Sequence, residues 1–573
     1  MSFPSVRVAG VERGPFAAFV VVGSPLLVGL SAKTPWWVSA VVVTVLVVTV
    51  TVRVSERTGA RWLLDWAAYR RARAARARER TQIARIRDVQ VAAGVCGVNE
   101  AGSTLVAMIQ LAPNLDLPTV IAERTLYTED TISVDMLFPM LDQFGIAVDI
   151  DIVTTGQRVR SGGSYSMLYD QLIGTHPVVG DRLTWLVVRL DQERNLQALS
   201  KRGPCAVVAP KALASATHRI ASRLRERGIA AHALPAAALR EATRLLHAGV
   251  ELSDLRENWS NLESSVPGRC VTSFLIDWTR LGTESLDDCW TWNRGRTTLV
   301  VSLTDDTGGP RAIVRFIGPA VTTDPPDYLR LLRGAQSTAL LASLPTGASV
   351  RALRGFESGA DIAPEDVVSD LAIAIGPNGQ ILGAISGQPR HTLALPLFDP
   401  ARFNPRRRTI DVQARLPVAQ QIILRAMVVG ADVEIHSARP ESWRQLVTAV
   451  GDPRSMRLAD PGDGHPRSQT AEVEPPATIA VFDHLPPRAS RAHTTVTISE
   501  PGGPRRRAVD LAINQVSATA VDVSIPMRTV RVDLIEPRGE TRYFDTVDGP
   551  PAHPAQAPGP VVAPPQPGGR RVS

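Results

Sequence analysis

Two aspartates separated by one residue form the pattern in this chain that best matches a known chemistry. Asp149 and Asp151 lie in the stretch "IAVDIDIV". Alternate side chains of a β-strand project from the same face, so a strand here would present both carboxylates together, as nucleotide-sugar transferases do to hold a divalent cation and a diphosphate. Such a triplet also arises about once by chance in a chain of this length. We therefore favour an exposed strand face, or ion pairs with Arg158 or Arg160, over a metal or nucleotide site.

Other signatures of catalysis or cofactor binding are missing from the sequence. The phosphate-binding motif G-x-x-x-x-G-K-[ST] is absent, and so are H-E-x-x-H, G-x-S-x-G and the kinase motifs. The four cysteines, at positions 96, 205, 270 and 289, lack the spacing of a zinc site and are expected to be reduced thiols. We predict no catalytic residue, no metal and no cofactor, and therefore a protein that is not an enzyme.

Positive charge is concentrated near the N-terminal end. The net charge is +7, and residues 53–80 contain nine arginines against three acidic residues, so the rest of the chain is almost neutral. Only 3 of the 63 basic residues are lysine, which is typical of codon bias in a GC-rich genome. We predict no nucleic-acid partner.

Two uncharged apolar runs precede this arginine cluster. They are "PFAAFVVVGSPLLVGLS" (Pro15–Ser31) and "WWVSAVVVTVLVVTVTV" (Trp36–Val52). Each run would span about 25 Å as a helix, which is short but sufficient for a bilayer. The pattern predicts a hairpin of two transmembrane helices within residues 15–52. If Met1–Ala32 were instead a cleaved signal peptide, the second span would keep the main body on the same side.

The charges and aromatic residues that flank the runs predict the orientation. Arginines close to a span are retained in the cytoplasm, so both termini and the main body are expected there, with the hairpin in the inner (plasma) membrane. Trp62, Trp66 and Tyr69 share one helical face, which either lies against lipid headgroups or packs on the body. The residues assigned to the membrane interface or to topology are Trp36, Trp37, Arg53, Arg57, Arg61, Trp62, Trp66, Tyr69, Arg70, Arg71, Arg73, Arg76, Arg78 and Arg80.

Composition and periodicity divide the chain into successive segments. The predicted order is 1–14, a cytoplasmic N-terminus; 15–52, two transmembrane helices; 53–82, an arginine-rich juxtamembrane helix; 83–330, a first α/β lobe; 331–452, a second α/β lobe; 453–477, a loop; 478–548, a β-rich region; and 549–573, a disordered proline-rich tail.

Within the body, several local patterns predict strands and helices. Leu183–Asp191 and Thr297–Asp305 read as buried strands, and Asn378-Gly379 as the tight turn of a β-hairpin. Two segments share a plan in which a strand, a helix ending at glycine, a second strand and a second helix follow in order. The first begins at "CAVVA" and the second at "TIDVQA". This similarity suggests two related β-α-β-α units, although coincidence is the alternative.

Besides the hairpin, several segments follow one another in a distinctive order. They are "RSGGSYSMLYDQLIG" (Arg160–Gly174), "RLTWLVVRLD" (Arg182–Asp191), "KRG" (Lys201–Gly203), "CWTWNRGRTTLVVSL" (Cys289–Leu303), "LPLFDP" (Leu395–Pro400) and "GADVEIHSARPESW" (Gly430–Trp443). Taken in this order, the hairpin and these segments resemble EccE, a membrane component of the type VII (ESX) secretion systems of mycobacteria and related actinobacteria. The resemblance covers roughly residues 10–450 and rests on the combination of segments, none of which carries chemistry by itself.

The resemblance implies a structural and assembly subunit of the secretion translocon, with EccB, EccC and EccD as partners. EccC is the FtsK-like ATPase of that family, which agrees with the missing phosphate-binding loop. The expected fold is therefore a membrane protein with two transmembrane helices, a cytoplasmic α/β body that resembles glycosyltransferases in outline, and a β-rich C-terminal region. The alternative function is a membrane-tethered transferase that uses a nucleotide-sugar donor at Asp149 and Asp151.

Overall fold

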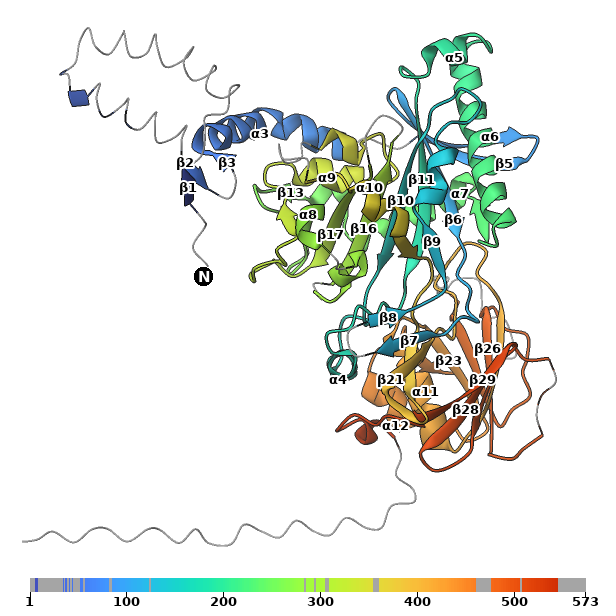
Figure 1. Ribbon diagram of the computed structural model, residues 1–573. Coiled ribbons are helices and arrows are strands. Elements are labelled where there is room, and N and C mark those ends of the chain that lie inside the picture. Colours follow the sequence, from blue (N-terminus) through green and yellow to red (C-terminus); the bar gives the residue numbers. More distant parts are fainter. Residues whose placement is uncertain are drawn as a thin grey trace, which may run out of the picture.

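The computed structural model contains a body with two large β-sheets, one above the other in Figure 1. The predicted α/β body is therefore confirmed. Most of the predicted hairpin, and all of the predicted tail, lie outside the residues that the structure describes. Those residues are 6–8, 35, 37–38, 41, 44, 52–54, 57–81, 85–122, 125–282, 285–292, 295–304, 309–353, 360–459, 476–504, 506 and 508–544.

The first sheet has twelve strands, and every pairing in it is antiparallel. The main path is β13-β14-β15-β17-β16-β10-β11-β6-β5-β4, with β12 beside β6 and β18 beside β15. The strands are β4 (Arg85–Val91), β5 (Gly94–Ala101), β6 (Thr104–Leu111), β10 (Asp149–Gly156), β11 (Leu183–Asp191), β12 (Ala231–Ala233), β13 (Arg256–Glu257), β14 (Leu262–Glu263), β15 (Cys270–Ile276), β16 (Arg296–Leu303), β17 (Arg311–Gly318) and β18 (Leu329–Leu331).

The central strands of this sheet are buried on both faces, which explains their nearly continuous apolar sequences. In β11, Leu186 and Val188 enter a core that includes helix α6, whereas Trp185 and Val187 enter a second core that includes α7 and α9. This alternation follows from the two-residue period of a strand. The helices of this part are α5 (Leu196–Ser200), α6 (Cys205–Glu226), α7 (Ala236–His247), α8 (Trp278–Leu281), α9 (Gln336–Ala342) and α10 (Glu365–Asp370), with 3-10 turns η1 (Asp135–Met140), η2 (Leu252–Asp254), η3 (Leu286–Trp290) and η4 (Val350–Ala352).

The second sheet also has twelve strands, and it is mixed, with parallel pairings at one end and antiparallel pairings at the other. Its order is β24-β23-β25-β26-β22-β27-β28-β29-β20-β21-β7-β8, with parallel pairing from β24 to β27. Helices α4 (Ser164–Ile173), α11 (Leu416–Val428) and α12 (Glu441–Val450), and the turn η5 (Thr541–Tyr543), contribute to its core. The strands are β7 (Thr119–Ala122), β8 (Thr125–Tyr127), β20 (Gln380–Ile385), β21 (Gln388–Leu395), β22 (Arg408–Gln413), β23 (Val433–Ser437), β24 (Met456–Leu458), β25 (Ile479–Asp483), β26 (Thr494–Ser499), β27 (Leu511–Gln515), β28 (Ala520–Ile525) and β29 (Arg528–Leu534).

The two sheets do not divide the chain at a single point. Strands β7 and β8 lie between β6 and β10 in the sequence, but they pair beside β21 at the edge of the second sheet. Helix α4 lies between β10 and β11, yet its Tyr165 and Tyr169 belong to the core of the second sheet. The core of the second sheet is therefore completed by chain that leaves the first sheet and returns to it.

One predicted strand is a helix. The residues of "CAVVA" form the first turns of α6, because the helix presents Ala209, Leu213 and Ile220 along one buried face. Only the second of the two similar segments therefore has the predicted β-α-β-α plan, in β22, α11, β23 and α12. The interpretation of two related units was wrong.

The predicted hairpin at Asn378-Gly379 is also wrong, since these residues connect two different sheets. Strand β19 (Ala372–Ala374) pairs with β9 (Thr131–Ser133), whereas β20 pairs with β21. Gly379 has φ +76°, and a Cβ there would lie 2.1 Å from the nitrogen of Pro396. The Asn378 side chain accepts a hydrogen bond from the Val179 amide at 2.8 Å. The glycine thus adopts the positive φ angle that was expected, but the dipeptide links strands of two different sheets and not two strands that pair with each other.

The other predicted strands are confirmed. Residues 183–191 form β11, and residues 296–303 form β16, which covers most of the strand predicted at 297–305. The predicted β-rich region supplies β25 to β29, all of which extend the second sheet. The short strand β24 falls inside the predicted loop of residues 453–477.

Short strands join the two ends of the predicted hairpin. Strand β1 (Val6–Val8) pairs antiparallel with β2 (Val52–Val54), which also pairs with β3 (Arg57–Thr58). Helix α3 (Gly59–Arg80) follows directly and runs beside the first sheet (Figure 1). Within the described residues, no helix combines the length and the apolar character needed to cross a membrane.

We predict that a side chain at Gly180 destabilises both parts of the body together. A Cβ at this position would lie 2.8 Å from the Val429 Cβ and 2.9 Å from the Arg158 carbonyl oxygen. Gly180→Ala should therefore lower the free energy of unfolding by about 1–3 kcal/mol, in one cooperative transition measured by denaturant titration. Ser161→Ala, at an exposed position of the same segment, is the control. Two separate transitions, of which only one shifts, would contradict the prediction.

Candidate functional site

Asp149 and Asp151 both form ion pairs at the start of β10. Arg194 Nη1 lies 2.9 Å from Asp149 Oδ1, and the Asp149 side chain is 17% exposed. Arg189 binds Asp151 directly, and both side chains are almost fully buried. The acidic pair is therefore not an exposed strand face, because the Asp151 side chain is almost fully buried and that of Asp149 is largely covered.

Arg189 connects this pair to the rest of the first part. Its remaining N–H groups donate to backbone carbonyls, including those of Thr346 at 3.1 Å and Leu344 at 3.0 Å. Burial lowers the pKa of Arg189 to about 10, and the nearby Asp149 carboxylate opposes that shift. Burial also raises the pKa of Asp149, while Arg194 opposes this increase. The arrangement matches a structural ion pair in which the arginine also donates to backbone carbonyls, while Asp151 Oδ1 accepts no hydrogen bond from the described residues.

The predicted partners Arg158 and Arg160 pair elsewhere, so that prediction was wrong. Arg158 binds Asp170 at 3.0 Å and Arg160 binds Asp432 at 2.8 Å. Strand β10 separates them from the acidic pair, because the aspartates lie at its start and both arginines follow its last residue, Gly156. A strand rises about 3.3 Å per residue, so this separation exceeds the reach of an arginine side chain.

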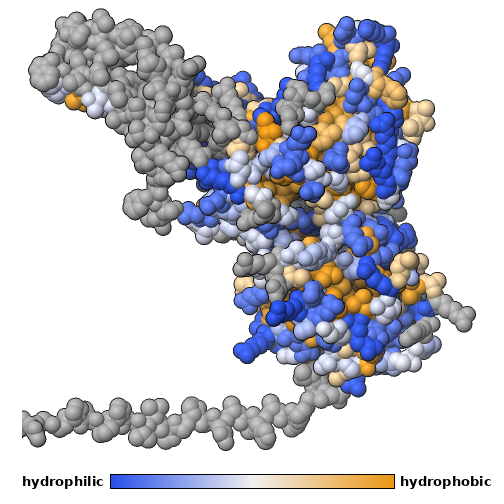
Figure 2. Space-filling model, in the orientation of Figure 1, coloured by the Kyte–Doolittle hydropathy of each residue, from blue (hydrophilic) through white to orange (hydrophobic). Residues whose placement is uncertain are grey.

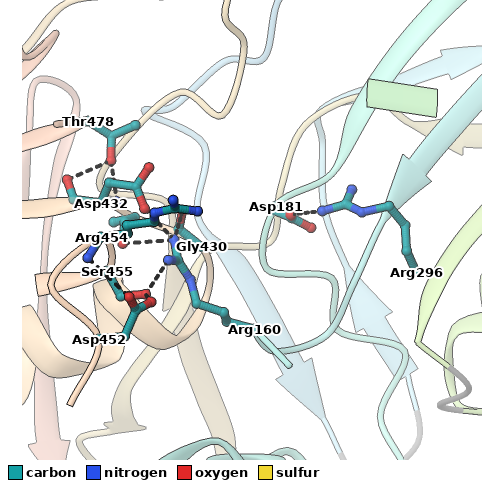
Figure 3. A network of polar contacts seen from close by, with 10 residues as sticks. Arg160, Asp181, Arg296, Gly430, Asp432, Asp452, Arg454, Ser455 and Thr478 are labelled. Carbon is teal, nitrogen blue, oxygen red and sulfur yellow. Dashed lines mark hydrogen bonds and ion pairs between the residues drawn. The ribbon is translucent and has the colours of Figure 1, made fainter. Parts of the chain in front are cut away.

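Arg160 and Asp181 belong to a polar junction between the two sheets (Figure 3). The Arg160 guanidinium donates to the Gly430 carbonyl oxygen at 2.8 Å and contacts Ser455 Oγ. Asp181 binds Arg296 of the first sheet and accepts a hydrogen bond from the Gln157 amide at 2.7 Å. Burial raises the pKa of Asp181, and Arg296 opposes that shift. These contacts fix the segment around α4 to both sheets.

The arginine-rich helix α3 is fixed to the body by its inner face. Tyr69 Oη donates to the Glu257 carbonyl oxygen at 3.1 Å, and Arg76 Nε lies 3.1 Å from the Glu257 carboxylate. The rings of Trp62 and Tyr69 lie 5.5 and 5.2 Å from that of Trp259. For these two aromatic residues, packing against the body is therefore the arrangement that the structure shows.

Arg80 completes this attachment at the end of α3. Its guanidinium donates to Ser337 Oγ at 2.6 Å and to the Leu255 carbonyl oxygen at 2.9 Å, and it lies 3.6 Å from the Glu257 carboxylate. Burial lowers the pKa of Arg80, while Glu257 opposes the shift. One buried glutamate thus neutralises two arginines that follow each other by one helical turn.

The outer face of α3 carries the remaining basic residues. Trp66 is 48% exposed, and the Arg70 guanidinium lies 5.1 Å from the centre of its ring. Arg70, Arg71 and Arg78 are exposed and Arg73 is partly buried. The six arginines of residues 69–80 therefore serve two purposes, since two of them bind Glu257 and the others stay on or near the surface.

The other predicted interface residues are only partly described. Trp37 is 58% exposed, and Trp36 lies outside the described residues. Arg53 is in β2, Arg57 in β3, and Arg61 in the first turns of α3. Their role in membrane topology stays a prediction.

Sequence reasoning missed Glu257, Trp259 and Arg189. Arg189 could have been found, because a charged residue inside the apolar stretch "LTWLVVRLD" must have a buried partner. Glu257 gave no such signal, since it lies 181 residues from Arg76. Among the described residues, no group of three or more His, Cys, Asp or Glu side chains is arranged to hold a metal ion.

Comparisons with known proteins relate this architecture to one family. A family model described as "Putative type VII ESX secretion system translocon, EccE" matches residues 178–276. The chain is 26% identical over 464 residues to ESX-2 secretion system protein EccE2 of Mycobacterium tuberculosis, covering 77% of this chain and 80% of that protein. It is 32% identical over 164 residues to ESX-1 secretion system protein EccE1 of the same species, covering 28% of this chain and 34% of the relative.

A further match supports the same family. The chain is 30% identical over 222 residues to ESX-5 secretion system protein EccE5 of Mycobacterium marinum, covering 36% of this chain and 53% of the relative. These matches confirm the resemblance to EccE that the sequence segments predicted. The chain is similar to components of type VII secretion systems.

We predict that Arg189 and Arg194 differ strongly in their effect on stability. Arg189→Met leaves Asp151 buried without a counter-ion and should lower the free energy of unfolding by about 3–5 kcal/mol. Arg194→Met removes the partner of a more exposed carboxylate and should cost about 0–1 kcal/mol. Denaturant unfolding of the two variants provides the comparison. Equal effects would show that the Asp151 pair is not the buried ion pair described here.

Proposed function

We propose that this protein is a structural and assembly subunit of a type VII (ESX) secretion translocon in the inner membrane. In this proposal it is not an enzyme and has no ATPase site of its own. Its partners are the EccB, EccC and EccD components, with EccC as the ATPase, and it has no nucleic-acid partner or cofactor. The likeness to ESX proteins named EccE supports the assignment to secretion.

The observation that carries the proposal is the attachment of α3 to the body through Glu257. A helix that follows a membrane segment can orient a cytoplasmic body only if the helix and the body are rigidly joined. The paired rings of Trp62, Tyr69 and Trp259, and the two arginines on Glu257, supply such a joint. A subunit built in this way would hold its body at a fixed place beside its membrane partners.

The N-terminal strands support a membrane hairpin with both ends in the cytoplasm. Because β1 pairs with β2, the residues that flank the two apolar runs lie side by side. Two spans that start and finish at one place must return to the same side of the bilayer. Trp66, Arg70, Arg71 and Arg78 on the outer face of α3 are suited to the headgroup region of that side.

The pairing of Asp151 with Arg189 supports a structural role for the acidic pair. A transferase would need both carboxylates free for a cation and a diphosphate. Asp151 instead neutralises a buried arginine, whose other bonds hold the backbone that follows α9. We therefore rank the membrane-tethered transferase second to the assembly subunit.

We predict that Glu257→Gln weakens assembly of the translocon. The change removes the charge that holds Arg76 and Arg80, so α3 should separate more easily from the body. A mild-detergent pull-down of the tagged chain from its native membrane, with quantitative mass spectrometry, should recover an FtsK-like ATPase and other translocon subunits in fixed ratios. For Glu257→Gln, this recovery should fall severalfold.

Glu100→Gln is the matched control, because Glu100 pairs with Arg87 on the surface of the same sheet. Its pull-down should equal that of the unmodified chain. Recovery of the chain alone, or together with envelope-synthesis enzymes, would contradict the proposed function.

We also predict that Asp149→Asn leaves secretion intact. This variant removes the more accessible member of the acidic pair without exposing the buried Arg189. Calorimetric titration of the protein with nucleotide-sugar donors in the presence of Mg²⁺ or Mn²⁺ should give no binding before or after the change. Micromolar binding that Asp149→Asn abolishes would favour the transferase instead.

A further inference from the structure

A tight turn in the first part of the body carries an exposed phenylalanine in a strained conformation. Asp142 and Ala147 form an antiparallel bridge, and the Gln143 amide donates to the Ile146 carbonyl oxygen at 2.9 Å. Phe144 and Gly145 stand at the tip, with φ angles of +59° and +76°. Positive φ at both central residues is the geometry of a type I′ turn, in which Asn-Gly is the preferred pair.

The local backbone conformation does not favour a phenylalanine at this position. A bulky residue with positive φ is strained, and the Phe144 side chain is 72% exposed. Scattered apolar residues are normal on a protein surface, and Figure 2 shows several among the hydrophilic residues on one face. Phe144 differs from them because its positive φ angle is unfavourable for a bulky side chain. Strain of this kind is found where function requires it.

Two arginines contact Phe144, one at its ring and one at its backbone. The Arg219 guanidinium lies 4.7 Å from the centre of the Phe144 ring, and its Nε donates to Gln143 Oε1 at 3.1 Å. Arg202 donates to the Phe144 carbonyl oxygen at 2.6 Å. Burial lowers the pKa of Arg219, and the positive charges of Arg223 and Arg202 lower it further.

These three arginines are not neutralised by the protein itself. Within the described part of the chain, Arg202, Arg219 and Arg223 form no ion pair. The nearest carboxylate of the turn, that of Asp142, instead accepts a hydrogen bond from the Gly145 amide at 2.7 Å. The surface therefore combines a projecting aromatic ring with unneutralised positive charge.

An apolar neighbour lies on the same side of the molecule. Asn195 makes two hydrogen bonds of 2.8 Å to the backbone of Ala147, which fixes the start of α5 beside the turn. The next residue, Leu196, is 57% exposed.

The turn is remote from the helix that follows the apolar runs. Helix α6, which carries Arg219, packs on β4, β5 and β6 at one end of the first sheet, whereas α3 lies at the β13 end. Figure 1 shows α3 and α6 on opposite sides of this part. The position thus favours a protein partner over the bilayer that α3 would approach.

We propose that the turn of residues 142–147, with Phe144 as its anchor, is a docking site for a partner protein that presents an apolar pocket bordered by carboxylates. An aromatic ring and arginines are the residue types that dominate binding at protein interfaces. The ring fills the pocket, and the carboxylates neutralise Arg202, Arg219 and Arg223. This proposal concerns the surface alone and does not require that the partner be a secretion subunit.

The test uses the full chain in mild detergent and two variants. Phe144→Asn replaces the ring by the residue that a type I′ turn prefers, so its melting temperature should be equal or higher. Arg219→Gln with Arg223→Gln removes two of the charges, and Arg244→Gln, on the exposed face of α7, is the control. In quantitative pull-downs, the recovered amount of one partner protein should fall about tenfold with Phe144→Asn. The double variant should lower the recovery of that same partner by a similar factor, and the control should leave it unchanged.

Photo-crosslinking identifies the partner and its site. A benzoyl-phenylalanine placed at position 144 should crosslink to that same protein, at a peptide rich in apolar and acidic residues. Unchanged recovery with both variants would overturn the proposal, as would a lower melting temperature for Phe144→Asn, which would assign Phe144 to the stability of the turn. If the two variants lost binding to vesicles of anionic lipid while the recovery of the partner protein stayed unchanged, the proposal would be overturned in favour of a membrane contact.

If no translocon subunit is recovered but the crosslink forms, the proposed function fails and this proposal stands.

Discussion

The chain between β10 and β11 holds the two halves of the body together. It leaves the centre of the first sheet, places Tyr165 and Tyr169 in the core of the second, and returns past Gly180. The backbone at Gly180 approaches α11 so closely that a Cβ would meet Val429. Because the segment begins and ends in central strands, the two sheets cannot separate without disturbing both cores. This segment therefore contributes to both halves of the body.

Buried arginines provide much of the polar bonding inside the body. Arg425 lies 2.9 Å from the Glu540 carboxylate, and Tyr165 donates to the same glutamate, so the last described segment is fixed to α11 and α4. Arg315 is fully buried with hydroxyl and carbonyl partners such as Ser343 Oγ at 2.6 Å, and burial lowers its pKa to about 9. A guanidinium has five N–H donors in a fixed plane, which lets it saturate several acceptors in a core where an ammonium group would leave them unpaired.

The same chemistry decides what the two charged regions of the chain do. The acidic pair and the arginine-rich helix both look like ligand-binding features when they are seen alone. In the folded protein, Asp151 neutralises Arg189, and Glu257 neutralises Arg76 and Arg80. Accessible arginines lie on the outer face of α3 and near Phe144, on two different sides of the first part of the body.

The sequence alone determined the elements whose signal is local. The β-branched runs of β11 and β16, the strands of residues 478–548, and the α/β character of the body all follow from side-chain periodicity. The order of short segments was also sufficient for the likeness to EccE, because that likeness depends on sequence and not on geometry. The apolar runs and the arginines that follow them belong to the same class of signal, although their place in a membrane stays a prediction.

Only the tertiary structure decided which residues meet. "CAVVA" has the composition of a strand, but packing of Leu213 and Ile220 against the first sheet makes it the start of a helix. Asn378-Gly379 has the dipeptide of a hairpin, but its flanking strands pair in different sheets. Glu257 and Arg76 are 181 residues apart, and no local pattern records such a contact. Its free energy depends on burial and on the exclusion of water, which arise only when the chain is folded.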